Sequence, residues 1–278
     1  ARHAGDLITE AGIRLNHRMK HKTDPGHSFG WDDLDLVIRL RPNEVTIVAA
    51  RTSVGKTVFG LNLATNLAMA NVPTLFASLE MSDQELTDRL ACMVSNLDFI
   101  RYQYGNLTAE EYMAFCDAAE RIKESSLYIN DNADQTMLQI SGEARRMKSA
   151  GQLEVLIVDY LQIVRPEVRR RDKREEIDDI SRRLKLVAKQ LSVPVIALCQ
   201  VNRAGADKEP ELHMLRDSGA IEQDADNVII LHKDEVNEKS DTDEMSVIVA
   251  KQRNGPKKRV FLTHHKSTFR LVGKERYP

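Results

Sequence analysis

Short apolar runs alternate with amphipathic stretches between residues 44 and 200. Five runs are rich in β-branched or aromatic residues and are expected to be strands, at Val45–Ala49, Thr74–Ala77, Leu127–Ile129, Val155–Val158 and Val195–Leu198. Helical patterns fill the gaps, at Thr57–Ala70, Asp83–Ser95, Ala109–Glu124, Met137–Ala150 and Glu175–Leu191. Continuous apolar strands separated by helices predict an α/β fold, in which a mostly parallel sheet is covered on both faces.

The pattern changes after residue 227, where strand-like runs follow one another with few helices between them. These runs are Val228–Leu231, Ser246–Ala250, Arg259–Thr263 and Phe269–Leu271. We expect them to extend the same sheet in antiparallel fashion, so that residues 27–278 form one core domain.

Residues 1–26 have a pattern of their own. An apolar stripe at helical spacing consists of Leu7, Ile8, Ala11, Leu15 and Met19. A breaker stretch, Thr23–Gly26, follows and predicts a linker. The stripe must be buried, either on its own domain or on a neighbouring subunit, and the pattern alone leaves both interpretations open.

A glycine-containing turn stands between the first strand and the next helix. It reads Ala50-Arg51-Thr52-Ser53-Val54-Gly55-Lys56-Thr57. Strand, turn, Lys-Thr and helix is the P-loop arrangement, in which backbone N–H groups surround phosphate oxygens. Lys56 would reach the β- and γ-phosphates, and the Thr57 hydroxyl suits Mg²⁺. Ala50 departs from the pattern, which begins with Gly; the alternative is a chance Gly-Lys-Thr in a surface turn.

Three other strands end in polar side chains, which should gather at the carboxyl edge of a parallel sheet. Asp159 ends an apolar strand and would serve Mg²⁺, unless it only terminates a buried strand. Glu80 would act as general base if its strand neighbours the P-loop strand; alternatively it is a charge before a helix capped by Ser82. Gln200 can donate and accept, so it could sense a γ-phosphate.

A basic pair lies near the end of the chain. Lys251 and Arg253 are two residues apart, so on a strand they point the same way. Two cations that project together suit a triphosphate. The competing interpretation is an exposed hairpin edge that carries basic residues against aggregation.

Composition limits the possible partners. The 278 residues are 42% hydrophobic, enough for a sizeable core, and the formal net charge is −2. No overall field therefore draws the chain to nucleic acid, and any such contact must use local basic patches. Three scattered cysteines, expected to be buried, fit a reducing cytosol and no zinc site. No long apolar run is present, so we expect a soluble cytoplasmic protein that does not enter a membrane.

Taken together, the motifs resemble the helicase domain of DnaB-type replicative DNA helicases, which has a RecA-like ATPase core. The matching segments, over residues 30–272, are Ala49–Thr57, Ser78–Met81, Val158–Gln162, Gln200–Arg203, Leu215–Asp226 and Lys251–Pro256. The acidic stretch before Asp226 and the Lys-Gln-Arg-Asn-Gly-Pro turn are more specific than the P-loop. Ala at the first P-loop position is acceptable in this family.

The resemblance implies roles for individual residues. Arg51, Ser53, Val54, Gly55, Lys56 and Thr57 would bind ATP, with Thr57 and Asp159 serving Mg²⁺. Glu80 would activate water, and Gln200 would sense the γ-phosphate. Arg253 would be an arginine finger, with Lys251 beside it, on ATP held by the adjacent subunit. The family forms hexameric rings around single-stranded DNA and moves 5′ to 3′.

The family contacts DNA through loops that follow the strands ending at Asp159 and Gln200. The candidate side chains here are Arg165, Arg169, Arg170, Arg171, Arg203 and Lys208. Such a cluster could follow a phosphate backbone, but a solvated charge run is an equal alternative because aromatic residues for base stacking are lacking.

The resemblance also implies partners, namely a primase and a helicase loader. Residues 1–26 match the family's linker helix, which docks on the adjacent helicase domain, so the chain is expected to be an isolated helicase domain. The rival interpretations are another RecA-like ATPase, such as a recombinase or a regulator, and a scaffold that binds ATP without turnover. Glu80 argues against the scaffold, since a pure switch needs no water-activating carboxylate.

Overall fold

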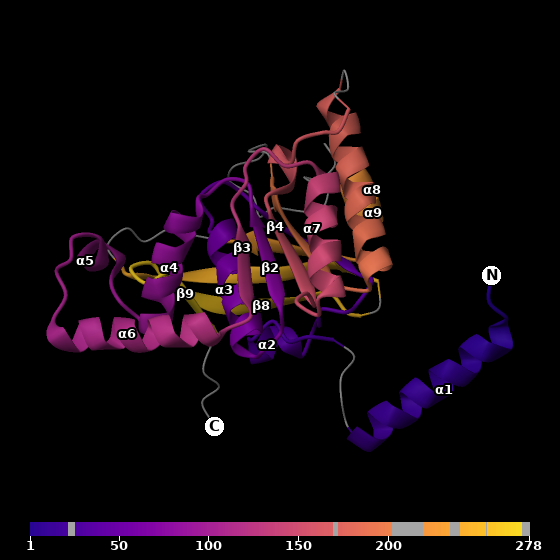
Figure 1. Ribbon diagram of the computed structural model, residues 1–278, viewed down its shortest axis with the longest axis horizontal. Coiled ribbons are helices and arrows are strands. Elements are labelled where there is room, and N and C mark those ends of the chain that lie inside the picture. The colour runs from indigo at the N-terminus through magenta and orange to yellow at the C-terminus, as the bar shows by residue number, and fades with distance from the viewer. Residues whose placement is uncertain (22–25, 169–171, 202–218, 234–239, 254, 274–278) are drawn as a thin grey trace.

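The computed structural model describes residues 1–21, 26–168, 172–201, 219–233, 240–253 and 255–273, and it is built around one sheet (Figure 1). In these residues the sheet has nine strands in the order β3-β2-β4-β5-β1-β6-β7-β8-β9. The strands are β1 Val45–Ala50, β2 Thr74–Ser78, β3 Leu127–Asn130, β4 Val155–Asp159, β5 Val195–Gln200, β6 Asn227–His232, β7 Thr242–Gln252, β8 Lys258–His265 and β9 Arg270–Gly273.

The sheet has a parallel part and an antiparallel part, as the sequence predicts. Neighbouring strands from β3 to β6 pair in parallel. Strands β7, β8 and β9 continue the sheet in antiparallel pairing. In the parallel part Ala50 pairs with Gln200 and Ser78 with Asp159, so the strand ends that carry polar groups lie along one edge.

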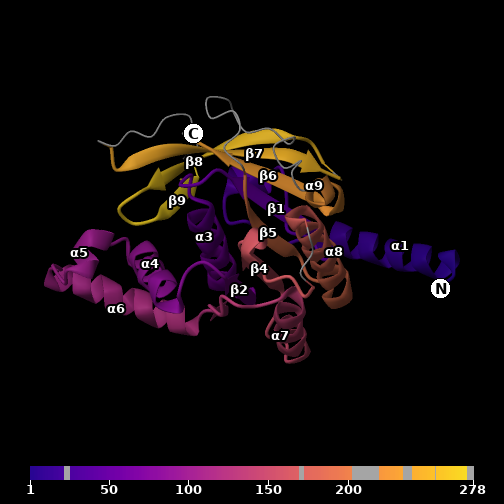
Figure 2. The same cartoon turned by 90° about the horizontal axis from the view of Figure 1, so that it is seen from above.

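Helices cover both faces of the parallel strands. Figure 2 shows α3 and α4 on one side of these strands and α7 and α8 on the other. The helices are α1 Ala4–His21, α2 Asp32–Asp35, α3 Lys56–Met69, α4 Asp83–Ser95, α5 Phe99–Gln103, α6 Ala109–Glu124, α7 Met137–Ser149, α8 Lys173–Leu191 and α9 Gly219–Asp224, with a 3₁₀ turn η1 at Leu161–Ile163.

Side-chain alternation along β1 divides the core into two clusters. Ile47 and Ala49 pack in the cluster that contains α7 and α8. Val48 and Ala50 pack in the cluster that contains α3. Every residue of β1 is buried, and all but Thr46 are apolar, so the strand does not show the alternation of a half-exposed strand.

Capping residues explain where several predicted helices begin. Ser82, Thr108 and Thr136 each accept from the backbone N–H three residues later and form capping boxes for α4, α6 and α7. The bounds of α4 and α6 are those that the sequence predicts. Helices α2, α5 and α9 were not predicted, since each has six residues or fewer and is too short to show a periodic pattern.

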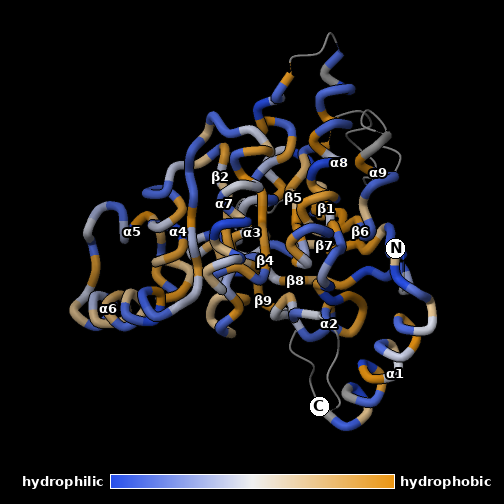
Figure 3. Tube along the Cα trace, turned by 45° about the vertical axis from the view of Figure 1, so that its right-hand side comes forward, coloured by the Kyte–Doolittle hydropathy of each residue, from blue (hydrophilic) through white to orange (hydrophobic). Residues whose placement is uncertain are grey.

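Helix α1 stands apart from the sheet (Figure 1), and hydrophobic and hydrophilic residues alternate along it (Figure 3). Ile8 and Met19 of its apolar stripe are 71% and 72% exposed. The stripe therefore has no cover from the described part of its own chain. None of the helices in that part combines the length and the apolar character that a membrane span needs.

The cysteines correct one expectation. Cys92 and Cys199 are buried as predicted, but Cys116 is exposed on α6. Helix α6 lies at the periphery and buries little of its surface, so the prediction that Cys116 is buried was wrong. Within the described ranges, His, Cys, Asp and Glu residues form no group of three or more that could hold a metal ion.

Candidate functional site: a phosphate-binding turn and a distant pair of cations

The turn after β1 has the backbone shape of a phosphate cradle. Ser53 and Gly55 have positive φ values of 67° and 109°, and α3 begins immediately afterwards at Lys56. At Gly55 a side chain would be strained by this φ, and a Cβ would lie 3.1 Å from Met245 Cε. The first N–H groups of α3, which have no partner within a helix, thus come directly after this turn, as in an anion-binding helix start.

A pocket opens at this turn. Polar and charged side chains from three elements line it together with the P-loop backbone; the lining residues are Ala50, Arg51, Thr52, Ser53, Gly55, Lys56, Thr57, Val58, Glu80, Arg89 and Gln200. The P-loop residues named from the sequence thus meet Glu80 and Gln200 at one edge of the sheet, with Val54 in the turn beside them.

Lys56 is the centre of the charge arrangement. Its Nζ lies 2.8 Å from Asp159 Oδ1, 3.5 Å from Glu80 Oε2 and 3.5 Å above the centre of the Tyr160 ring. The side chain is only 11% exposed. Two carboxylates therefore hold the ammonium where a phosphate would otherwise take it.

Asp159 fits a place beside Mg²⁺. The side chain is fully buried, and among the described residues neither of its oxygens accepts a hydrogen bond, although Lys56 lies within ion-pair distance. A buried carboxylate with unsatisfied oxygens is costly, and a hard cation satisfies such oxygens. The Thr57 residue lines the pocket, and its hydroxyl would offer a further oxygen donor of the kind that Mg²⁺ prefers.

Glu80 lies beside Lys56, but its strand is not the neighbour of the P-loop strand that the sequence analysis required. The condition that β2 should neighbour β1 is not met, because β4 and β5 lie between them. Glu80 nevertheless lies 3.5 Å from Lys56, since the lysine side chain extends across the edge of the sheet toward β4 and β2. Ser82 caps α4 with Glu85 as its partner, so Glu80 is not needed for capping. Its side chain is 49% exposed and open to water.

Gln200 is held by a second glutamine. Gln162 accepts from the Gln200 backbone N–H at 3.1 Å and donates to the Gln200 carbonyl at 2.7 Å. The Gln200 side chain donates to the Thr52 hydroxyl at 3.0 Å. This amide therefore lies against the P-loop in a fixed backbone setting and lines the pocket.

Arg89 is a residue of the pocket that sequence reasoning missed. It lies on α4 with its guanidinium 5.0 Å from the centre of the Phe269 ring. Burial lowers the pKa of Arg89, while the nearby carboxylates of Glu85, Asp159 and Glu80 raise it. The sequence did contain one sign of this position. Arg89 follows Leu86 by three residues, so on a helix it lies on the same face as that buried leucine. Such a position needs an anionic partner.

Lys251 and Arg253 lie at the opposite edge of the sheet, where the parallel strands begin and not where they end. Lys251 pairs with Val228, and the Arg253 backbone N–H donates to the Asp226 carbonyl, whereas Ala50 pairs with Leu231 at the P-loop edge. Arg253 is thus about five strand residues from the P-loop level, on the order of 17 Å along the strand. Within its own chain it does not reach the nucleotide pocket.

Both cations contact the segment between α9 and β6. Lys251 Nζ donates to the carbonyls of Glu222 and Ala225, the latter at 2.8 Å, and thereby caps the carboxyl end of α9. Burial lowers the pKa of Lys251, and Arg253 adds to that effect. Arg253 Nη1 lies 3.2 Å from Asp226 Oδ1, and its side chain is 52% exposed.

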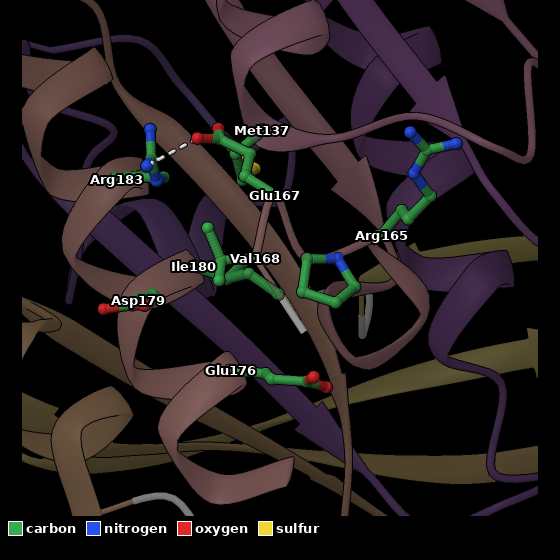
Figure 4. A pocket seen from close by; sticks show the side chains of 9 residues that line it. Met137, Arg165, Glu167, Val168, Glu176, Asp179, Ile180 and Arg183 are labelled. Atoms are coloured by element: carbon green, nitrogen blue, oxygen red, sulfur yellow. Dashed lines mark ion pairs between the residues drawn. The ribbon is translucent and has the colours of Figure 1, made fainter. Parts of the chain in front are cut away.

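The candidate DNA-binding residues lie mostly outside the described residues. Those are Arg169, Arg170, Arg171, Arg203 and Lys208. Arg165 is described and exposed, and it forms an ion pair with Asp134 at 2.7 Å. Figure 4 shows Arg165 among the residues that line a pocket, directed away from the Glu167–Arg183 ion pair of that pocket. Its side chain is therefore at the surface while the Asp134 contact is kept.

Curated sequences support a common origin with replicative helicases. The chain is 39% identical over 250 residues to the replicative DNA helicase DnaB of Leifsonia xyli, covering 87% of this chain and 55% of that protein. It is 38% identical over 280 residues to the replicative DNA helicase DnaC of Bacillus subtilis, covering 98% and 62%. The chain thus spans little more than half the length of these relatives.

Solved structures have the same fold. One of them, described as an ATPase domain, superposes with a TM-score of 0.88 at 29% identity, covering 96% of this chain and 99% of that one. A DnaB-like replicative helicase studied with primase gives a TM-score of 0.87 at 29% identity, covering 96% and 66%. The model of the DnaB-like helicase C terminal domain matches residues 26–272. With its P-loop, its strand-end carboxylates and this match, the chain belongs to the DnaB-like helicase C-terminal domain family.

Proposed function

We propose that this chain is the ATP-hydrolysing motor of a ring-forming replicative DNA helicase, which moves 5′ to 3′ on single-stranded DNA and unwinds duplex at the fork. The observation that carries the proposal is the separation, within one copy, of the P-loop turn from the arginine proposed as the finger. The phosphate-binding turn lies at one edge of the sheet and Arg253 at the other. A single copy therefore cannot bring its own finger to its own nucleotide.

Within one copy, the pocket residues have distinct tasks in this proposal. Backbone N–H groups of the turn and Lys56 bind the ATP phosphates. Thr57 and Asp159 would hold Mg²⁺, which neutralises charge on the phosphate oxygens when bound. A bound phosphate competes with the carboxylates for Lys56, and Glu80 is then free to accept a proton from the attacking water. Gln200 hydrogen-bonds the γ-phosphate.

Between copies, Arg253 and Lys251 would complete the site of the adjacent subunit. A finger supplied in trans makes hydrolysis depend on how two subunits sit against each other. A ring of six copies can then turn over in sequence. The exposed stripe of α1 favours the second of its two interpretations, in which the helix docks on the neighbouring helicase domain.

Nucleic acid and protein partners follow from the same proposal. Basic residues in the loops after β4 and β5 would contact the phosphates of single-stranded DNA, including Arg165. One similar solved structure is described as a DnaB-like replicative helicase interacting with primase, which supports a primase as partner here. A helicase loader and a cytoplasmic location also belong to the proposal.

Strand displacement with forked and tailed duplexes tests the proposed activity. We expect ATP-dependent unwinding when the loading strand has a free 5′ tail, and none by Lys56→Ala, which has lost the phosphate-binding ammonium. Equal use of 3′ tails would refute the polarity. Strand pairing without displacement would instead favour a recombinase. The mass in solution with a non-hydrolysable ATP analogue tests the ring, which requires six times the monomer mass.

A further inference from the structure

A buried carboxylate stands behind the exposed finger. Asp226 is only 4% exposed and lies between α9 and β6. Its Oδ2 accepts from the Val45 backbone N–H at 2.8 Å and from Lys185 Nζ. Its Oδ1 lies 3.2 Å from Arg253 Nη1. One side chain therefore joins the start of β1, helix α8 and the finger.

The two oxygens of Asp226 have different partners, and this separates two roles. Contacts at Oδ2 bind elements of the same core, because Val45 begins β1 and Lys185 lies in the middle of α8. The contact at Oδ1 is made to a guanidinium that is half exposed and on no regular strand. A carboxylate whose orientation is fixed at one oxygen can fix an arginine at the other.

Burial makes this arrangement stiff. A buried carboxylate is costly unless its charge is paired, and Asp226 has two cationic partners. The long Arg253 side chain would otherwise sample many rotamers, and ordering it at an interface has an entropic cost. Holding the guanidinium before the adjacent subunit arrives lowers that cost.

We propose that Asp226 is a positioning residue, whose Oδ1 orients Arg253 toward the nucleotide of the adjacent subunit and whose Oδ2 is fixed by Lys185 and the Val45 N–H. The inference rests on the proposed function, since it concerns the finger of that same shared site. It adds a mechanical link from α8, which follows a candidate DNA-binding loop, to the residue that completes the next site.

The substitution Asp226→Asn tests the proposal. The amide oxygen can keep the contacts made by Oδ2, and the amide NH₂ then replaces Oδ1 and cannot accept from Arg253. We expect ATP hydrolysis to fall by about tenfold to hundredfold, the size expected for loss of a charged hydrogen bond. Binding of an ATP analogue to the variant's own P-loop should not change, because that P-loop lies at the other edge.

Mixed assemblies separate positioning from structural damage. Asp226→Asn subunits mixed with Lys56→Ala subunits should recover hydrolysis, since one supplies an intact P-loop and the other an intact finger. Mixing with Arg253→Ala subunits should give no recovery, because both lack a working finger. Glu44→Gln is the matched control, since Glu44 accepts from Asn227 at the same edge and should leave the rate unchanged.

The outcomes are distinguishable. Arg253→Ala subunits mixed with Lys56→Ala subunits are measured in parallel, and recovery of hydrolysis there shows that the site is shared. Given that recovery, the positioning role is overturned if Asp226→Asn hydrolyses ATP at the wild-type rate. It is also overturned if Lys56→Ala subunits do not restore hydrolysis to Asp226→Asn. If Arg253→Ala subunits are not recovered either, the shared site itself is wrong. Should Asp226→Asn fail to fold, Lys185→Gln loosens the carboxylate from the other side and must give the same recovery pattern with a smaller loss.

Discussion

The cations at the two edges of the sheet differ in burial and in the number of carboxylates that contact them. At the P-loop edge Lys56 is 11% exposed and lies between Asp159 and Glu80 of its own chain. At the opposite edge the Arg253 side chain is 52% exposed and touches one carboxylate with part of its guanidinium. The first edge is internally neutralised, whereas the second presents charge outward. This difference is what the proposed function requires, since it assigns Arg253 to the nucleotide of another copy.

The contrast also concerns which groups could change partner. In the proposed function a bound phosphate competes with Asp159 and Glu80 for Lys56, so contacts in the pocket would be exchanged on binding. Arg253 can keep its contact with Asp226 through one nitrogen while other donors of the guanidinium contact an anion. Lys56 would therefore exchange one anionic partner for another, whereas Arg253 would gain a second partner and keep the first.

The largest effect should come from Arg253→Ala. We expect hydrolysis by the assembled protein to fall by about a thousandfold or more, as for other arginine fingers, with ATP-analogue binding preserved. Steady-state hydrolysis and equilibrium binding measure the two quantities. If the affinity falls as much as the rate, Arg253 serves binding and the contrast between the edges fails.

Glu80→Gln should have the next largest effect. The amide cannot accept a proton from water, so hydrolysis should fall by about a hundredfold or more while ATP binding persists. Glu111→Gln is the control, because Glu111 is a carboxylate of the capping box of α6 and does not line the pocket. Unchanged turnover in Glu80→Gln would remove the general-base assignment.

Arg89→Met should act on affinity. The half-buried guanidinium of Arg89 lines the pocket, near the carboxylates of Glu85, Asp159 and Glu80. A triphosphate bound in that pocket would be a further anionic partner for it. We expect affinity for ATP to weaken by about tenfold to hundredfold, and more for ATP than for ADP. Titration calorimetry with both nucleotides measures this. Arg121→Met on α6 is the control; equal losses for both nucleotides would place Arg89 away from the γ-phosphate.

The smallest effect should come from a change remote from both edges. Thr108→Ala removes the cap of α6 and should lower the free energy of unfolding by about 1 kcal/mol. Denaturant unfolding measures this loss. Hydrolysis per folded subunit should be unchanged, and a parallel loss of activity would show that rates report stability and not the chemistry of either edge.

The P-loop edge was largely predictable because it depends on strand ends. Parallel strands bring their carboxyl ends to one edge, so Asp159 and Gln200 could be placed beside Lys56 from sequence alone. Glu80 was placed near the phosphates on a condition that is wrong, since β2 does not neighbour β1. The reach of a lysine side chain across two strands made up the difference, and sequence patterns do not encode that reach.

The opposite edge was less predictable because its contacts are tertiary. Lys251 and Arg253 could be noted as a pair, but their level relative to the P-loop depends on the antiparallel register of β7 on β6, which contains a shift at Val228/Ile229. The buried setting of Asp226 depends on Lys185, which is 41 residues away in sequence. Arg89 was missed because an isolated arginine in a helix has no motif around it.

The placement of the two edges has a consequence for stoichiometry. If Arg253 serves a neighbour's nucleotide through a head-to-tail contact, each interface joins unlike surfaces and holds one complete site. An open row of copies always leaves one P-loop at one end and one finger at the other without use. Only closure by rotation gives every nucleotide its arginine, and an opening in the ring therefore leaves one site silent.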